Sequence, residues 1–378
     1  MPAHSKHTEI AIIGGGIVGL TLAYMAARKG LGVTVFERNS QAVGASIRNF
    51  GMIWPIGQAA GKGLRRALRS RELWREASDT CGFWRIENGS LHLAYHEDEW
   101  HILQEFQEGA SDKRFQVSLC SPDEVLQTYQ GINPRGLKGA LRSETEMIVD
   151  PREVPQKLAS WLQHQANCQV LFDHPVQHME DGRLATNGEE WMFDQAFICC
   201  GSDFETLYPQ VFLGSALIKS KLQMLRTFPQ AGGWRVGASL CAGLTLAHYA
   251  SFTDCPSLPA LKARIQEESP QFFDWGIHVM VSQNGKGELV LGDSHEYAKS
   301  FDPFIREEVN TYIMDYLRTF FQGPDMRIME RWYGVYAKNP HGIDFIKYVS
   351  PKNTLVTGVG GAGMTHSFGL AEELIQKL

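Results

Sequence analysis

Four residues near the start of the chain have the types and the spacing that hold a dinucleotide. Gly14, Gly16 and Gly19 form the pattern Gly-x-Gly-x-x-Gly, and Glu37 follows 18 residues after the last of them. In such a pattern the first glycine permits a tight turn, the second lets the backbone approach a pyrophosphate, and the third lets a helix lie close to a strand. A carboxylate at this distance accepts hydrogen bonds from a ribose diol and repels a 2′-phosphate. The pattern therefore favours NAD or FAD over NADP.

The segments around these residues predict a strand, a glycine turn, a helix and a second strand. An apolar run at 10–13 precedes the glycines, small and apolar residues fill 20–29, and a second apolar run at 33–36 ends before Glu37. The N-terminus of such a helix presents free N–H groups and the positive end of its dipole to phosphates. The uncharged stretch 10–27 is also long enough to cross a membrane, but its clustered glycines fit the strand–turn–helix unit, so we expect no membrane span.

A second glycine turn lies near the end of the chain. Residues 353–357 predict a strand, 358–363 a glycine turn and 364–377 a helix, which would place a second set of backbone donors against a ligand. The stretch 44–55 is also rich in glycine and follows the second strand of the opening unit. This loop could therefore cross over the cofactor and bind a phosphate or a ring system.

Composition limits the class of protein. The chain has 378 residues with ordinary globular composition, which suggests roughly two domains. A net charge of −6 argues against a nucleic-acid partner. The seven cysteines form no Cys-x-x-Cys pair, so we expect neither a disulfide framework nor a metal site. This cysteine content fits a reducing cytoplasm, where we expect the protein, and the first ten residues hold no signal peptide.

The remaining segments alternate between helical and extended patterns. Alternation in 243–251 predicts a strand with His248 and Tyr249 on opposite faces, and Asn284-Gly285 predicts a hairpin. Arginines crowd the amphipathic stretch 64–77, where we expect them mostly on a solvated face: Arg65, Arg66, Arg69, Arg71 and Arg75. Further helices are expected at 98–108, 154–165 and 304–321, and further strands at 89–94, 169–172, 176–179 and 193–200.

Together the opening fingerprint, the loop 44–51, Asp150-Pro151, Gly201 and the tail 358–365 resemble the D-amino-acid oxidase and glycine oxidase superfamily. Its members are FAD-dependent oxidases and dehydrogenases of amines and amino acids, and the resemblance covers almost the whole chain in order. It implies FAD, with the ADP half at the fingerprint and the flavin at the tail. The cofactor contacts that we predict are Gly14, Gly15, Gly16, Ile17, Val18, Gly19, Glu37, Arg38, Ala45, Ser46, Asn49, Phe50, Gly51, Met52, Val176, Cys200, Gly201, Gly334, Gly360, Gly361, Gly363, Met364 and Thr365.

A covalent flavin link through cysteine or histidine occurs in this superfamily. Since the segment 332–336 and the tail contain no cysteine, we expect noncovalent FAD.

Three stretches, 292–297, 331–336 and 248–249, resemble a subgroup of the superfamily encoded near phosphonate-catabolism genes. This closer resemblance implies an aminophosphonate substrate, such as 2-aminoethylphosphonate or an N-alkyl derivative. Amino-acid-oxidising members carry an arginine two residues after the glycine of a Trp-x-Gly motif, where it clamps the substrate carboxylate. Here that position is Tyr336, and the fork geometry of arginine is hard to replace, so a standard α-amino acid is in doubt. The departure also fits an amine that bears no acid.

The resemblance implies that a neutral amine binds beside the flavin and that a hydride passes to the flavin from the carbon next to nitrogen. The imine then hydrolyses to an aldehyde and an amine or ammonia, and oxygen or another acceptor reoxidises the flavin. No protein base need act on that carbon, so we assign no catalytic residue. The substrate contacts that we predict, each of which could instead be structural, are Trp54, Arg48, His248, Tyr249, His295, Tyr297, Tyr336, Lys338 and Thr365.

Alternative functions remain open at this point. One is a D-amino-acid or glycine/sarcosine-type oxidase or dehydrogenase, and another is a flavoprotein whose FAD is not catalytic. An aromatic hydroxylase is a third, because Gly292-Asp293 resembles its Gly-Asp motif, but here this pair ends a hairpin far from the tail glycines. A nicotinamide dehydrogenase would contain no flavin at all.

The fold class that we predict is α/β. A discontinuous Rossmann-like FAD-binding domain would comprise 1–82, 144–213 and 330–378. A mainly antiparallel α+β substrate domain would comprise 83–143 and 214–329, with the ligand between the two domains.

Overall fold

The opening glycine unit folds as its sequence predicts. In the computed structural model, which describes residues 6–110 and 113–378, β1 (Lys6–Ile13) leads through the glycines into α1 (Ile17–Arg28) and then β2 (Val33–Phe36). Gly14 has a φ of +111°, a left-handed value that suits glycine. A Cβ on Gly19 would lie 2.0 Å from the Gly14 carbonyl oxygen, so only glycine lets α1 start this close to β1. The turn geometry is thus set locally by the glycines.

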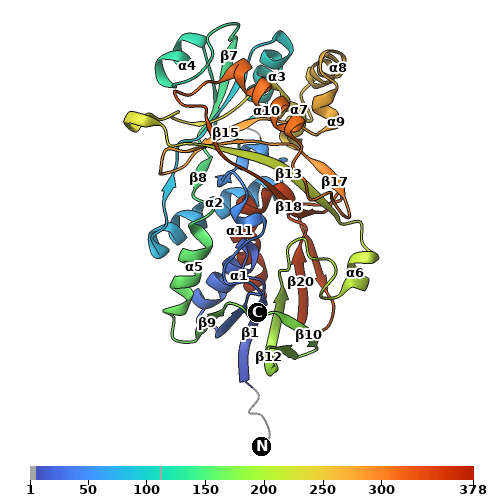
Figure 1. The fold of residues 1–378 in the computed structure, drawn as a ribbon. Helices are drawn as coiled ribbons and strands as arrows, with labels where there is room; N and C mark the ends of the chain where they lie inside the picture. Colours follow the sequence, from blue (N-terminus) through green and yellow to red (C-terminus); the bar gives the residue numbers. More distant parts are fainter. Residues whose placement is uncertain (1–5, 111–112) are drawn as a thin grey trace, which may run out of the picture.

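The first sheet has eight strands and gathers segments from the beginning, middle and end of the chain. The strands β9, β2, β1, β12 and β20 run parallel, while β10, β11 and β19 add antiparallel edges. Helices α1, α2, α5 and α11 pack together beside it in the lower half of Figure 1. The bounds are β9 (Cys168–Leu171), β10 (Val176–Glu180), β11 (Arg183–Thr186), β12 (Glu189–Ile198), β19 (Phe345–Tyr348), β20 (Asn353–Thr357), α2 (Lys62–Cys81), α5 (Val154–Gln163) and α11 (Gly363–Ile375).

The second sheet has nine strands in the order β17-β13-β16-β15-β14-β5-β7-β6, with β18 also paired to β13. All its pairs are antiparallel except β14 with β5. It lies in the upper half of Figure 1 with α3, α4 and α7 to α10. The strands are β5 (Ser90–Ala94), β6 (Val117–Cys120), β7 (Gly139–Ser143), β13 (Ile218–Thr227), β14 (Ser239–Cys241), β15 (Met280–Gln283), β16 (Leu289–Gly292), β17 (Glu296–Ala298) and β18 (Ile328–Lys338). The helices are α3 (Glu97–Glu108), α4 (Pro122–Thr128), α7 (Gly243–His248), α8 (Leu258–Glu268), α9 (Gln271–Asp274) and α10 (Glu307–Phe320).

A small third sheet and one short helix complete the strands and α-helices of the described residues: β3 (Met52–Ile53), β4 (Arg85–Ile86), β8 (Met147–Val149) and α6 (Pro209–Leu213). Short 3-10 helices lie at Ala45–Ile47, Pro55–Gly57, Ala231–Gly233, Ala250–Phe252 and Gly360–Ala362. The predicted α/β architecture is confirmed, with a Rossmann-like sheet and a mainly antiparallel second sheet. The predicted domain boundary at residue 330 falls inside β18, which pairs along β13 over its whole length. The other domain boundaries stay a prediction.

The strand predicted at 243–251 is wrong. Residues Gly243–His248 form α7, and the Leu244 N–H donates to the Tyr316 hydroxyl at 3.0 Å, which supplies a partner at the helix start. The rings of His248 and Tyr249, expected on opposite faces, both approach His278, with centroids 3.8 Å and 5.5 Å away. A short apolar run fits both periods, so alternation alone could not separate strand from helix.

The solvated arginine face predicted on α2 is also partly wrong. The Arg66 side chain is only 1% exposed and bonds Glu373 at 2.7 Å and Asp344 at 2.5 Å. Arg69, by contrast, is 43% exposed and pairs with acids at the surface. The spacing of residues along α2 could not reveal that Arg66 is buried in ion pairs, because its partners, Asp344 and Glu373, come from the distant C-terminal segment.

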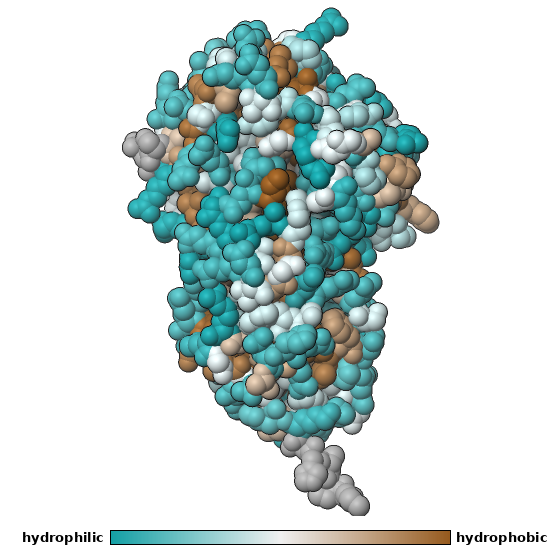
Figure 2. Space-filling view, turned by 90° about the vertical axis from the view of Figure 1, so that its left-hand side faces the viewer, coloured by the Kyte–Doolittle hydropathy of each residue, from teal (hydrophilic) through white to brown (hydrophobic). Residues whose placement is uncertain are grey.

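The sequence predicts no membrane span, and the helices of the structure are consistent with this prediction. Across the described ranges 6–110 and 113–378, every helix is too short or too polar to cross a bilayer. On the face shown in Figure 2, hydrophilic residues predominate and hydrophobic ones are scattered in small groups.

Candidate cofactor and substrate site

One long cavity of about 670 Å³ runs from the residues around Glu37 to those around Lys338. The carboxyl ends of β1 and β2 line it from the first sheet, and β13, β15 and β18 line it from the second. The loop 44–54 and the tail turn 358–363 close its sides. The cavity therefore lies where both sheets meet, as the sequence predicts for the ligand.

At the Glu37 end, a buried carboxylate is held in place by the first turn. The Gly15 N–H donates to Glu37 Oε2 at 2.7 Å, and both the backbone and the side-chain amide of Asn39 donate to Oε1 at 2.9 Å. Arg38 binds Asp203 at 2.6 Å beside it. Val176, Cys200 and Gly201 line the same cavity. This end suits a neutral, hydroxyl-bearing group that donates to the fixed carboxylate.

In the middle of the cavity, α1 starts beside the loop 44–54. The Ile17 N–H donates to Ser46 Oγ at 2.8 Å, and a Cβ on Gly16 would lie 3.0 Å from that oxygen. Asn49 shapes the loop itself, because its amide donates to Ala45 and Ser46 carbonyls and its oxygen accepts from the Gly51 N–H at 2.8 Å. The close approach of helix start and loop fits a narrow anionic group such as a pyrophosphate.

At the tail turn, α11 begins beside the cavity. Thr365 Oγ1 accepts the Trp54 N–H at 2.9 Å, and Thr357 donates to the Gly201 carbonyl at 2.7 Å. A Cβ on Gly361 would lie 3.2 Å from the Tyr336 hydroxyl. The N-cap residues of α1 and α11, Gly16 and Ala362, make no side-chain hydrogen bond to these helix starts, and at α1 Ser46 accepts the Ile17 N–H. Both helix starts therefore leave backbone donors for a ligand.

Three of the predicted cofactor residues lie behind the cavity wall: Gly15, Gly19 and Gly51. Gly15 holds Glu37, Gly19 brings α1 against β1, and Gly51 (φ +73°) would place a Cβ 2.0 Å from the Val149 carbonyl oxygen, where β3 meets β8. The other predicted cofactor residues line the cavity, and their contacts with the cofactor stay a prediction.

All nine predicted substrate residues line the cavity, and most gather around Lys338. Lys338 Nζ donates to the Tyr297 hydroxyl at 3.1 Å and lies 4.5 Å from the centre of that ring. The His295 ring is 6.2 Å from Tyr297 and 6.4 Å from Tyr336. The Lys338 end thus combines one cation with aromatic and imidazole groups, while the role of each stays a prediction.

The sequence analysis missed two residues at this end, His278 and Asp293. They face each other across the hairpin of β15 and β16, where the Asp293 N–H donates to the His278 carbonyl at 2.9 Å. Asp293 Oδ1 lies 3.1 Å from His278 Nε2 and 3.8 Å from His295 Nδ1. The hairpin turn predicted at Asn284-Gly285 could have revealed this pair, because the strand pairing that follows from this turn places His278 opposite Asp293.

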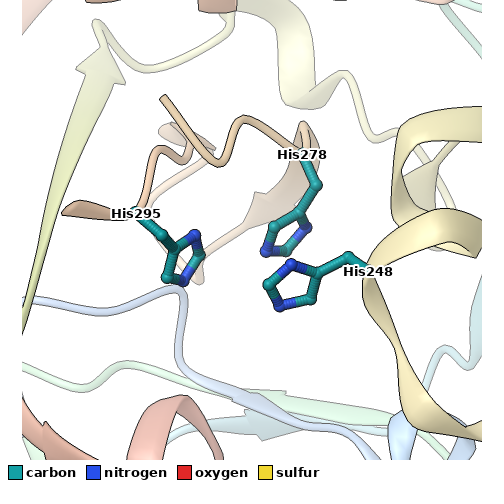
Figure 3. Close-up of side chains that lie close together, drawn as sticks. All are labelled: His248, His278 and His295. Carbon is teal, nitrogen blue, oxygen red and sulfur yellow. The ribbon is translucent and has the colours of Figure 1, made fainter. Parts of the chain in front are cut away.

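Figure 3 shows the rings of His248, His278 and His295 converging from separate segments of the chain. His248 ends α7, His278 precedes β15 and His295 follows β16. One ring nitrogen from each lies within 4.8 Å of the others, a spacing that a metal ion could bridge. The expectation of no metal stays a prediction. We call these three residues the histidine cluster.

The surrounding protein sets the protonation of the histidine cluster, in which His278 and His295 are buried and His248 is exposed to the cavity. Desolvation lowers the pKa of His248 and His278 well below the usual value, and it lowers the pKa of His295 to about 4. The same burial raises the pKa of the Asp293 carboxyl and of the Tyr336 hydroxyl. At neutral pH the imidazoles are therefore neutral with one N–H each, and His295 directs its N–H from Nδ1 to the Gly276 carbonyl at 3.1 Å.

The cavity as a whole fits an extended dinucleotide with a ring system. Its fixed carboxylate suits a ribose, the first helix start suits a pyrophosphate, and the second helix start suits the polar edge of a flavin. The cavity continues past the second helix start to Lys338 and Tyr297.

Known proteins with similar sequences and folds agree with this geometry. A family model named DAO, FAD dependent oxidoreductase, matches residues 9–377. D-amino acid dehydrogenase 2 from Pseudomonas aeruginosa is 23% identical, with 98% of this chain and 94% of that protein covered. Glycine oxidase from Geobacillus kaustophilus has a similar structure, with a TM-score of 0.77, 16% identity and coverage of 99% and 95%.

A match of higher identity covers less of both proteins. One of the subunits of opine oxidase from Rhizobium meliloti is 36% identical over 58% of this chain and 63% of its own length. Several curated relatives match this chain over 58% of its length. In these matches the chain spans only 34% to 63% of the length of the relative. The DAO model, however, matches the chain almost from end to end. The chain therefore belongs to the DAO family of FAD-dependent oxidoreductases, enzymes of amino acids and amines.

Proposed function

We propose that this chain oxidises the C–N bond of a small amine that carries an anionic group. The observation that carries the proposal is the Lys338 end of the cavity, where one ammonium group and the neutral histidine cluster lie beside the tail glycine turn. An amine with an acidic group would be attracted by Lys338 and oriented by the imidazole donors, which places its carbon near the start of α11.

Each part of the chain has a proposed task in this reaction. Glu37 and the start of α1 hold the ADP half, and Gly361, Gly363 and the start of α11 hold the ring system noncovalently. Bound FAD supplies the two-electron acceptor for a hydride from the carbon next to nitrogen. The substrate amine reacts in its neutral form, and aromatic side chains of the cavity wall, such as the buried Trp54, help to exclude water until the imine is formed.

Two substrate classes fit this proposal. The names of the relatives, D-amino acid dehydrogenase and glycine oxidase, support an amino acid, either primary or N-substituted. Tyr336 stands where a carboxylate-clamping arginine would be expected, and this position supports a differently shaped acid such as an aminophosphonate. The amino-acid class has the wider support from the comparisons, and the aminophosphonate class rests on the cavity residues.

Anaerobic incubation with matched amines tests the proposal. Glycine and aminomethylphosphonate form one pair, β-alanine and 2-aminoethylphosphonate a second, and sarcosine and iminodiacetate extend the carboxylate series. We expect one series to bleach the flavin absorbance, and the faster member of each pair names the acid. If every amine leaves the flavin oxidised, the FAD is not catalytic toward this class and the proposal is wrong. Mixing the reduced enzyme with oxygen or a quinone then separates an oxidase from a dehydrogenase.

A further inference from the structure

The histidine cluster contains more polar groups than the walls of an apolar pocket require. Two imidazoles and one carboxyl, those of His278, His295 and Asp293, are buried together, and the exposed His248 ring stacks on His278 from the cavity side. His278 Nδ1 and Asp293 Oδ1 are buried without a hydrogen-bond partner. Hydride removal from a carbon next to nitrogen asks for none of them. Buried polar groups are costly unless a partner satisfies them, so this cluster points to a ligand.

We propose that His248, His278, His295 and Lys338 form an oxyanion-binding site that receives the acidic group of the substrate. The identity of the ligand as substrate rests on the proposed function, whereas the site itself rests on the geometry. The groups that face the cluster from the surrounding elements are Asp293, Tyr249, Tyr297, Tyr336 and Lys338.

The arrangement of the rings favours an oxyanion over a metal ion. The His248 and His278 rings stack with centroids 3.8 Å apart and planes 26° apart, and the His278 and His295 planes differ by 15°. A metal bound to two imidazoles must lie close to both ring planes at about 2.0–2.1 Å from each nitrogen. Near-parallel rings instead keep their nitrogens at separate points within 4.8 Å of one another, which matches separate oxygens of one anion. His295, whose Nδ1 N–H is taken by the Gly276 carbonyl, would donate from Nε2 once it has taken up a proton.

The charge around the cluster points the same way. Lys338 lines the same cavity, and its ammonium group helps to lower the pKa of both His248 and His295. This cation would repel a divalent metal and attract an anion. Asp293, with its pKa raised by burial, can stay protonated or share one proton with His278 at 3.1 Å, so it need not oppose the anion.

Anion binding should therefore be coupled to proton uptake. The pKa of each imidazole is lowered by burial, and a nearby negative charge favours the protonated form again. If one proton is taken up, affinity falls by about tenfold for each pH unit over the range in which the proton is lost. Tyr249 and Tyr336 do not take part, because burial raises the pKa of both hydroxyls.

The test measures the binding of anions without an amine to the oxidised holoenzyme. Acetate, a planar carboxylate, and sulfate, a tetrahedral oxyanion, both keep a constant charge from pH 6 to pH 9. Calorimetry in two buffers of different ionisation enthalpy, together with the change in flavin absorbance, gives affinity and proton uptake. We expect binding that weakens as pH rises, with about one proton taken up, and the better probe distinguishes carboxylate from tetrahedral recognition. Affinity and proton number that do not change with pH would overturn the proposal.

Variants locate the site. His278→Asn, His295→Gln and Lys338→Gln should each weaken anion binding at least about tenfold with FAD content unchanged, whereas the exposed His164→Gln on α5 should bind as the parent does. If a buried histidine variant fails to fold, Lys338→Gln decides alone, because Lys338 is only half-buried at the end of β18. Unchanged affinity in Lys338→Gln would overturn the proposal.

A metal titration supplies the opposing outcome. One tightly held Zn²⁺ per chain after gel filtration, lost in His278→Asn, would show a metal site and overturn the oxyanion assignment. Failure of the proposed function can be distinguished from failure of this proposal. If anions bind at the histidine cluster but no amine reduces the flavin, the oxyanion site is supported and the proposed activity is wrong.

Discussion

Glu37 provides a sharp test of how the cofactor end is built. Its two carboxylate oxygens accept three N–H groups, from Gly15 at 2.7 Å and from the backbone and side chain of Asn39 at 2.9 Å. In Glu37→Gln one oxygen becomes an amide nitrogen that can only donate. In either orientation of the amide, its NH₂ group faces at least one of these backbone or side-chain N–H groups. Because residue 37 is only 7% exposed, water cannot readily replace the lost acceptor.

The magnitude follows from that count. The less costly orientation leaves one N–H of this turn without its acceptor, which lowers the free energy of unfolding by about 1–3 kcal/mol. The substitution also removes the negative charge that would accept from a ribose hydroxyl. Loss of one charged hydrogen bond of about 1.5–3 kcal/mol weakens FAD binding by about 10- to 150-fold.

The assay combines urea unfolding of the apoprotein with titration of FAD by fluorescence quenching. Glu9→Gln is the matched control, because Glu9 also accepts a glycine N–H, that of Gly32, but is exposed and lies away from the cavity. The control should change unfolding by no more than about 0.5 kcal/mol and leave FAD affinity as it was. Equal FAD affinity in Glu37→Gln and the parent would refute the assignment of Glu37 to the cofactor.

Three further predictions follow from buried groups. Arg66→Met should lower the free energy of unfolding by about 2–4 kcal/mol in a denaturant titration, because it strands Asp344 and Glu373, although the partial exposure of Glu373 moderates the loss. Tyr336→Arg should reduce kcat/KM for the native substrate by at least about tenfold, since a longer cation enters the wall beside Gly361; unchanged kinetics would remove Tyr336 from the substrate site. Burial lowers the pKa of His366 to about 4 and of His92 to about 3, so the unfolded chain binds more protons below about pH 6.5. Stability is then complete above that pH and falls by up to about 2 kcal/mol per histidine at pH 5, and a melting temperature that does not change between pH 7 and pH 5 would contradict this.

The local geometry at the Glu37 end was predictable because its requirements are local, while its contacts with FAD stay a prediction. Gly14 needs a left-handed φ, Gly19 must admit a carbonyl oxygen 2.0 Å from the position of a Cβ, and Glu37 directly follows β2. Each condition involves residues within a few positions of one another, or within one strand–turn–helix unit. The same holds for the tail turn, whose strand and helix were expected within one or two residues of their observed bounds.

The Lys338 end was only partly predictable because it is assembled by pairing between distant strands. His278 and Asp293 meet across a hairpin, and His248 reaches them from α7, where a strand was expected. Arg66 shows the same limit, since its partners Asp344 and Glu373 are about 300 residues away. The residue pattern along a helix or strand predicts which of its faces is buried. It does not predict which side chains of another element will contact that face.

This contrast also explains what family membership does and does not imply about substrate. Glycine oxidase from Geobacillus kaustophilus shares the fold at a TM-score of 0.77 with only 16% identity, so most side chains differ while the backbone path is kept. A cofactor site made from helix starts and close glycine approaches depends mainly on that path. A substrate site made from the side chains of His278, His295 and Lys338 does not. Whether these three residues receive the acidic group of the proposed substrate, and which acid it is, must therefore be decided by experiments on them, and the relatives bear on it only through the chemistry that they share.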